Sequence, residues 1–227
     1  MFNFVDEFDI ELTTEDILRG QGIDPNRASE RLHKLSASVI EETYSLIKPA
    51  AVYTLCEVTG FEHKKVLFKG GFFEGSLAAR AMAGADEIYI AVCTIGMALE
   101  ERVEKLMDEN PVMGVTLDGA GVAAVGKVSR AVEDLICSEA YKLDLSLGMR
   151  AEPGQEGWPI EQQRQVFSIL PTDKIGVTLT KNCLMMPRKS LSFVIARGKN
   201  LSNSLAPCDL CSKRERCGWR KEKKVAT

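Results

Sequence analysis

The residue types best suited to binding a small polar ligand lie between residues 150 and 163, where an arginine is followed by a Pro-Gly turn in the sequence RAEPGQEGWPIEQQ. The guanidinium fork of Arg150 suits a carboxylate, and the turn exposes backbone groups that can hydrogen-bond a planar base. Glycine in the turn lets a ligand approach the backbone closely. The same composition also allows an ordinary loop in which Arg150 pairs with Glu152 or Glu156. This segment is therefore a candidate ligand site, with a purely structural loop as the alternative.

A second candidate is a cysteine cluster near the C-terminus, in the sequence CDLCSKRERCGWR. Cys208, Cys211 and Cys217 have C-x2-C-x5-C spacing, which suits thiolate ligation of zinc or of an iron–sulfur cluster. The local motif lacks a fourth ligand, so a loose basic tail with incidental thiols is the alternative. The basic residues in 213–224 favour a solvated face or a docking patch for an acidic partner over a nucleic-acid site. The other cysteines have apolar neighbours and are predicted to be small core residues: Cys56, Cys93, Cys137 and Cys183.

Three common kinds of site lack their sequence marks. The chain has two histidines, His33 and His63, each beside a charged residue, so a histidine general base is poorly supported. The sequence has neither a Walker-type glycine-rich loop nor a G-x-G-x-x-G motif after a strand, which argues against nucleotide hydrolysis and dinucleotide binding. The net charge of -3 gives no broad basic footprint for nucleic acid.

The chain has 227 residues, of which 45% are hydrophobic and 27% charged, as is ordinary for one large globular domain. Residues 1–16 are acidic and do not resemble a signal peptide. The longest mostly apolar stretch, residues 88–99, is too short to cross a bilayer as a helix. We therefore expect a cytoplasmic protein with no membrane partner. The change to polar, cysteine-bearing and basic sequence after Lys199 predicts a domain over residues 1–199 and an appended tail over residues 200–227.

The elements that must position these residues are a mixture of helices and strands. Capping residues, prolines and helical apolar spacing predict helices that start at Thr13, Asp24-Pro25, Ser76, Met97, Asp118 and Pro159. The second of these runs to Pro49, and the fifth to about Leu143. Runs of β-branched and aromatic residues predict strands over residues 51–58, 65–68, 87–94, 175–179 and 191–196. Residues 150–158 are predicted to form a loop.

A series of short motifs follows in a fixed order between residues 94 and 190. They are Thr94-Ile95-Gly96, Leu99-Glu100, Leu117-Asp118, Gly148-Met149-Arg150, Pro153-Gly154, Trp158-Pro159, Gln162, Phe167, Ile175-Gly176-Val177, Leu179-Thr180, Met185 or Met186, Pro187 and Lys189-Ser190. Their order and spacing together resemble the activation domain of vitamin B12-dependent methionine synthase, over roughly residues 12–195. The likeness is strongest to stand-alone relatives of that domain associated with corrinoid methyltransferases.

The resemblance implies a mixed α/β (α+β) fold, with a twisted, largely antiparallel sheet flanked by helices. It implies binding of S-adenosylmethionine, with Arg150 on the amino-acid carboxylate and the backbone of Glu152, Pro153, Gly154 and Gln155 near the adenine. It further implies an accessory protein for reductive activation, by methylation, of a corrinoid-dependent methyltransferase or of methionine synthase. In that chemistry the reduced cobalt is the nucleophile, so the protein need only position the methyl donor.

The resemblance also implies partners. The sequence contains no Asp-x-His-x-x-Gly segment, the mark of a corrinoid module, so we expect a partner corrinoid protein or methyltransferase to supply the corrinoid, and a separate protein to donate the electron. Glu152 and Gln155 stand where the family usually has a small residue and a tyrosine. These departures favour one alternative, a non-catalytic module of the same fold that docks on a corrinoid protein. The other alternative is a metal or redox protein that acts through the tail cysteines.

Overall fold

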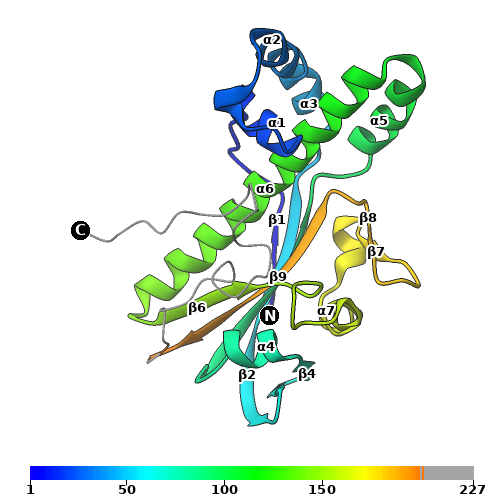
Figure 1. Cartoon of the computed structure of the whole chain (residues 1–227). Helices are drawn as coiled ribbons and strands as arrows, with labels where there is room; N and C mark the ends of the chain where they lie inside the picture. Colours follow the sequence, from blue (N-terminus) through cyan, green and yellow to red (C-terminus); the bar gives the residue numbers. More distant parts are fainter. Residues whose placement is uncertain (200, 202–227) are drawn as a thin grey trace.

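The structure is a computed structural model that describes residues 1–199 and residue 201. Over these residues the chain forms a seven-stranded sheet, in which every neighbouring pair is antiparallel, and a small two-stranded sheet. The large sheet has the order β4-β3-β2-β5-β9-β6, with β1 paired to the first part of β2. The strands are β1 Phe2–Val5, β2 Ala50–Glu62, β3 Lys65–Phe68, β4 Gly71–Glu74, β5 Glu87–Thr94, β6 Ser146–Ala151, β7 Thr178–Leu179, β8 Met185–Met186 and β9 Ser190–Gly198. Helices flank this sheet (Figure 1), which confirms the predicted fold class.

Strand β5 lies at the centre of the sheet. Its sequence, EIYIAVCT, is buried on both faces apart from the half-buried Glu87. From Glu87 to Thr94 each residue has a partner in β2 on one side and in β9 on the other. Because a central strand covered on both faces reads as a continuous apolar run, the sequence signal there is strong. The predicted strands over residues 87–94 and 191–196 are confirmed, the second as part of β9.

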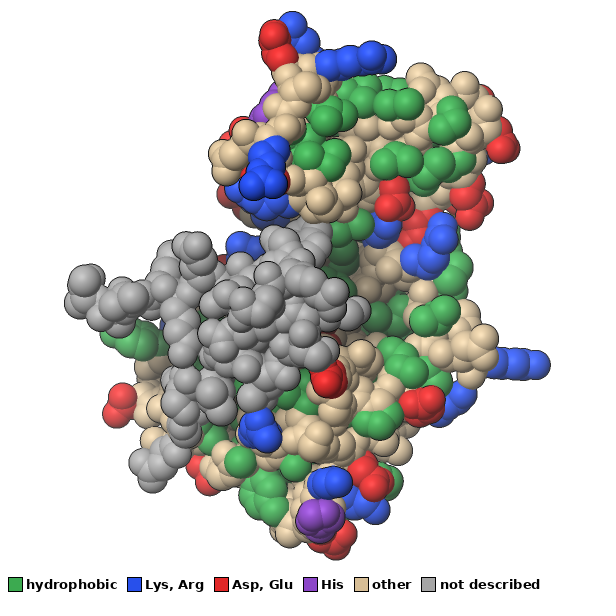
Figure 2. All heavy atoms as spheres, viewed as in Figure 1, with side chains coloured by type: hydrophobic (Ala, Val, Ile, Leu, Met, Phe, Trp, Pro, Cys, Tyr) green, Lys and Arg blue, Asp and Glu red, His purple; other side chains and the backbone are tan. Residues whose placement is uncertain are grey.

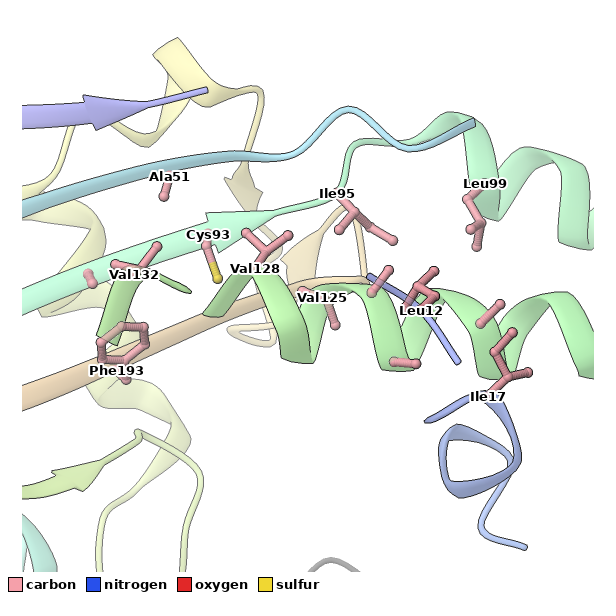
Figure 3. Close-up of a cluster of buried hydrophobic side chains, with 14 of the residues drawn as sticks. Leu12, Ile17, Ala51, Cys93, Ile95, Leu99, Val125, Val128, Val132 and Phe193 are labelled. Atoms are coloured by element: carbon pink, nitrogen blue, oxygen red, sulfur yellow. The ribbon is translucent and has the colours of Figure 1, made fainter. Parts of the chain in front are cut away.

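One face of the sheet is covered by the long helix α6. Helices α1 and α5 pack on α6, and with α2 and α3 they form a helical lobe at one end of the sheet (Figure 1). Cys93 and Phe193 project from the sheet toward Val125, Val128 and Val132 of α6 (Figure 3), within one buried apolar cluster that ties the sheet to the helices. The helices of this layer are α1 Thr14–Gly20, α2 Glu30–Ser38, α3 Ile40–Leu46, α5 Ala98–Glu109 and α6 Pro111–Lys142.

The opposite face carries a second buried apolar cluster under shorter helices. Phe73 and Trp158 meet there edge to face, with 5.2 Å between ring centroids. Ser76 is the first residue of α4, and the predicted capping position belongs instead to Gly75, whose φ is 153°. The helical segments of this face are α4 Ser76–Ala81, η2 Ile160–Gln162, α7 Gln163–Ile169 and η3 Thr172–Ile175.

The single helix predicted from Asp24 to Pro49 is wrong. Asp24 caps only the short 3-10 helix η1 (Pro25–Arg27), Ser29 caps α2, and the chain bends at Val39 before α3. Val39 is fully buried in the cluster under α6. Packing of Val39 in the core therefore favours the bend over the continuous helix that the apolar spacing predicts, because such spacing alone is only a weak indication of helix length.

The long helix α6 begins at Pro111 rather than after Asp118. Asn110 caps it, its side-chain oxygen accepting a hydrogen bond from the Met113 N–H at 3.4 Å. Pro111 occupies the first helical position, where its missing N–H costs nothing. It therefore starts α6 as well as following the end of α5.

Helix α6 is also a longer apolar segment than residues 88–99. By length and composition alone it is able to cross a membrane. However, 61% of its most apolar 18-residue window is buried inside the protein, as in the core helix of a globular domain.

Two further predictions are wrong near the candidate site. Arg150 belongs to β6 rather than to a loop, because the edge of β9 offers hydrogen-bond partners to its backbone. Residues 175–179, predicted as a strand, are divided between the end of η3 and the short β7, with Gly176 in the left-handed conformation (φ 71°) between them. Val177 lies between η3 and β7 and is buried. Its apolar side chain therefore packs in the core from a turn and not from a strand. Strands β1, β4, β6 and β8 were not predicted.

Candidate functional site

The edge strand β6 places Arg150. In its pairing with β9, Arg150 lies opposite Ile195, and Ala151 lies opposite Val194. Ile195 belongs to the apolar cluster under α6, whereas Ala151 and Val194 belong to the cluster on the other face. Because side chains alternate between the two faces of a strand, the Arg150 side chain points to the α6 face.

Two carboxylates from different parts of the chain bind the guanidinium of Arg150. Its Nε and Nη2 lie 2.9 and 2.7 Å from Glu152 Oε1, and its Nη1 lies 3.4 Å from Glu133 Oε2. Below it is the ring of Phe193, with 4.1 Å from the guanidinium carbon to the ring centroid. We call these four residues the Arg150 cluster. The Arg150–Glu152 pairing that the sequence allowed is present.

The Arg150 cluster is within reach of solvent. The side chains of Arg150, Glu133 and Glu152 are 19%, 24% and 28% exposed. They carry one positive and two negative charges. An ion-pair group that is neither buried nor fully hydrated can exchange partners with a small charged ligand, because each contact is only moderately strong.

Glu133 is the member of the cluster that the sequence did not reveal. It directly follows the buried Val132, so it lies at the border of the apolar stripe of α6. That position is a weak signal, because charged residues commonly flank the buried stripe of a helix. Only the packing of α6 against β6 brings Glu133 to Arg150.

Cys93 lies in the core on the same face of the sheet. Burial raises the pKa of its thiol to about 12, and attraction to the Arg150 charge acts in the opposite direction. The thiol is therefore protonated at neutral pH and unreactive, as expected of a small core residue. Cys56 and Cys183 are also buried, whereas Cys137 is exposed. The prediction for Cys137 is wrong, because it follows the buried Ile136 on the outer side of α6.

The Pro-Gly turn after β6 is closed by its own hydrogen bonds. The Gly154 N–H donates to the Trp158 carbonyl at 2.8 Å, and the Gln155 N–H donates to the Glu152 carbonyl at 3.2 Å. The Glu152 N–H donates to the side-chain oxygen of Gln155 at 3.0 Å. Gly154 has a φ of 96°, a conformation that favours glycine. Pro153 is buried and has no N–H. The Glu152 N–H is thus occupied by the Gln155 side chain rather than by another backbone group.

A cleft of about 650 Å³ lies between this turn and the start of α4. Its lining residues are Lys64, Glu74, Gly75, Ser76, Gly154, Gln155, Gly157, Trp158, Pro159, Ile160 and Gln162. The structure therefore divides the five predicted site residues. Arg150 and Glu152 join the Arg150 cluster, Gly154 and Gln155 line the cleft, and Pro153 is buried.

Motifs that are far apart in the sequence meet where the helical lobe joins the sheet. Glu100 accepts a hydrogen bond from the Lys189 N–H at 2.6 Å, and Lys189 Nζ donates to Asp118 Oδ1 at 2.7 Å. We call these three residues the junction cluster. Figure 2 shows acidic and basic side chains gathered at the waist between the lobe and the sheet. The junction cluster fixes the start of β9, the strand that carries Phe193 beneath Arg150.

The predicted metal ligands Cys208, Cys211 and Cys217 lie outside the described residues. Within the part of the chain that the structure describes, no group of three or more His, Cys, Asp or Glu side chains is arranged to hold a metal ion.

No family model matches the sequence, and no curated protein matches it. Among solved structures, the chain is similar to the MetH reactivation domain bound to AdoHcy. The TM-score is 0.65 and the identity 12%, over 91% of this chain and 81% of that chain. At this identity the likeness concerns the fold and not the function, which depends on the residues of the site. The chain therefore has the fold of the MetH reactivation domain.

Proposed function

We propose that this chain binds S-adenosylmethionine at the Arg150 cluster and acts as an accessory protein for reductive methylation of a corrinoid-dependent methyltransferase or of methionine synthase. The observation that carries the proposal is the half-buried Arg150 at the sheet edge, whose longest ion-pair contact, 3.4 Å to Glu133, a ligand carboxylate can replace. The fold supports it, because the solved structure that this chain resembles contains AdoHcy.

Arg150 binds the carboxylate of the ligand's amino-acid group in this proposal. Glu152 occupies the Nε side of the guanidinium, so the ligand takes the Nη1 side, where the 3.4 Å contact to Glu133 is the longest of the three. A guanidinium holds a carboxylate through two parallel hydrogen bonds. Glu133 then turns from Arg150 to the ligand's ammonium group, which keeps both carboxylates of the cluster paired.

The adenosine part of the ligand lies along the turn from Glu152 to Gln155. Adenine needs an N–H donor for a ring nitrogen, and the Glu152 N–H becomes such a donor once the Gln155 side chain releases it. The cleft beside Gly154 and Gln155 offers the space into which that side chain or the base can move. The positive φ of Gly154 keeps this part of the turn free of a side chain.

The chain's own contribution to the reaction is to orient the methyl donor. A corrinoid on the partner protein, once reduced by one electron from a separate donor protein, would supply the nucleophile that takes up the methyl group. Breaking the bond between sulfur and the methyl carbon returns an electron pair to sulfur and leaves S-adenosylhomocysteine, so no proton transfer is required. This agrees with a site that holds no histidine and gains its effect from positioning.

Isothermal titration calorimetry with S-adenosylmethionine tests the proposal. We expect binding by the full chain and a loss of at least about 30-fold in affinity for Arg150→Ala, since a charge-assisted contact contributes about 2 kcal/mol. Arg80→Ala is the matched control, because Arg80 is exposed on α4 and its removal changes the net charge equally. No heat with the wild-type chain would remove the methyl-donor role.

One observation favours a second candidate, a non-catalytic module that docks on a corrinoid protein. Arg150 already has two carboxylate partners within the chain, and Glu152 holds it through two nitrogens. In this case the three charges serve to fix β6 to α6 rather than to bind a ligand. Capture of a corrinoid protein by the wild-type chain and by Arg150→Ala alike, without S-adenosylmethionine, would support this candidate.

The tail cysteines carry a separate proposal, a zinc or iron–sulfur site at Cys208, Cys211 and Cys217. The support is their spacing alone. Metal analysis and a visible spectrum of the anaerobically purified full chain test it. A colourless sample free of zinc and iron would refute the proposal.

A further inference from the structure

The charges of the Arg150 cluster do not balance. Arg150 contributes one positive charge, and Glu133 and Glu152 contribute one negative charge each. The ring of Phe193 beneath the guanidinium presents its electron-rich face. The formal charges of the cluster therefore sum to -1, at a site that is partly exposed to solvent.

The carboxylate of Glu152 is held firmly at one oxygen. Both Nε and Nη2 of Arg150 contact Oε1, at 2.9 and 2.7 Å. The backbone of Glu152 is fixed as well, because its carbonyl accepts a hydrogen bond from the Gln155 N–H. Among the described residues, no hydrogen bond is formed with Glu152 Oε2. That oxygen is available to a cationic group of a ligand.

The two S-adenosyl ligands differ by one charge at sulfur. S-Adenosylmethionine has a carboxylate, an ammonium group and a sulfonium, with a net charge of +1. S-Adenosylhomocysteine has a neutral thioether and a net charge of zero. Coulomb attraction to a site of net charge -1 therefore favours the first ligand, and the partial exposure of Glu152 reduces this preference without removing it.

Resting on the proposed function, we propose that Glu152 is a specificity-determining residue, whose charge makes the site prefer the sulfonium ligand over the thioether product. Methyl transfer removes the positive charge from the bound ligand. The attraction between ligand and site weakens at that moment, so the product leaves and the next donor binds. Neither the size nor the shape of the methyl group needs to be sensed.

Calorimetric titration with three ligands tests this inference: S-adenosylmethionine, S-adenosylhomocysteine, and sinefungin, an analogue that has an amine at the position of the sulfonium. For the wild-type chain we expect about tenfold tighter binding of S-adenosylmethionine than of S-adenosylhomocysteine, with sinefungin close to the former. Glu152→Gln keeps the size and one acceptor oxygen and should lower this ratio about fivefold. The ratio should also fall as salt is added.

The matched control is Glu161→Gln, which removes the same charge at an exposed position of η2 outside the cluster and should leave the ratio unchanged. Failure of all three ligands to bind the wild-type chain would overturn the proposed function. Binding with the same ratio in wild type and Glu152→Gln would overturn only the role of Glu152. Loss of all binding in Glu152→Gln would also overturn that role, because Glu152 would then act by positioning Arg150.

Discussion

The Arg150 cluster and Glu100 of the junction cluster both tie a helix to the sheet region through charged side chains, but they differ in burial and in partners. In the junction cluster the Glu100 side chain is only 5% exposed and accepts a hydrogen bond from a backbone N–H at 2.6 Å. In the Arg150 cluster the carboxylates are 24% and 28% exposed and meet the charge of a side chain. A buried carboxylate bound to the backbone cannot leave without stranding its partner, whereas half-exposed side chains can exchange partners. The first arrangement suits a structural link and the second a ligand site.

Replacing Glu100 should have the largest effect on stability. Glu100→Ala removes the acceptor of the Lys189 N–H and a partner of Arg188, and we expect the free energy of unfolding to fall by about 3 kcal/mol. Urea denaturation followed by circular dichroism measures this. Glu104→Ala is the control, because Glu104 lies on the same helix, is 73% exposed and is 3.8 Å from the same Arg188, and it should cost less than about 0.5 kcal/mol. Equal losses in the two variants would contradict the difference in burial.

Replacing Glu133 should affect binding rather than folding. If Glu133 receives the ligand's ammonium group, Glu133→Gln weakens S-adenosylmethionine binding about tenfold, or about 1.4 kcal/mol. The same variant should change the free energy of unfolding by less than about 0.5 kcal/mol, because the 3.4 Å contact to Arg150 is long and partly exposed. Calorimetry and urea denaturation on the same preparation separate these effects. A loss of stability as large as that of Glu100→Ala would show that Glu133 is a structural link.

The stability cost of removing Arg150 tests the comparison directly. Arg150→Met keeps most of the apolar contact with Phe193 but loses both ion pairs, and we expect a loss of about 1 kcal/mol in the free energy of unfolding. Thermal and urea denaturation measure this loss. Arg80→Met, at the exposed position on α4, is the control. A loss of about 3 kcal/mol or more would place the Arg150 cluster with the structural links and weaken the proposed function.

The smallest effect is expected at Gln155. Its side chain occupies the Glu152 N–H, so Gln155→Ala frees this donor for the adenine and should strengthen S-adenosylmethionine binding about threefold. Calorimetric titration of Gln155→Ala and of the wild-type chain with S-adenosylmethionine measures this difference in affinity. Weaker binding would mean that the Gln155 side chain itself contacts the ligand.

Local sequence patterns predicted the elements whose signals depend on near neighbours. The apolar run of β5 and the helix start at Thr13 appear in the structure, and a helical segment follows Pro159, although it begins at Ile160 as the 3-10 helix η2. Two predictions failed: the unbroken helix through Val39 and the loop at Arg150. At both positions the backbone conformation depends on contacts with residues that are distant in the sequence. A bend that buries a valine and an edge strand that pairs with β9 both depend on residues far away in the chain.

For the site, the sequence by itself determined that Arg150 precedes a Pro-Gly turn and that Glu152, two residues further on, can reach it. These facts follow from spacing, because alternate residues of an extended segment share a face. Only the tertiary structure decided which face that is, added Glu133 from α6 and Phe193 from β9, and separated Gly154 and Gln155 from the charged cluster. The physical reason is that the net charge and the exposure of a site depend on the elements packed around it.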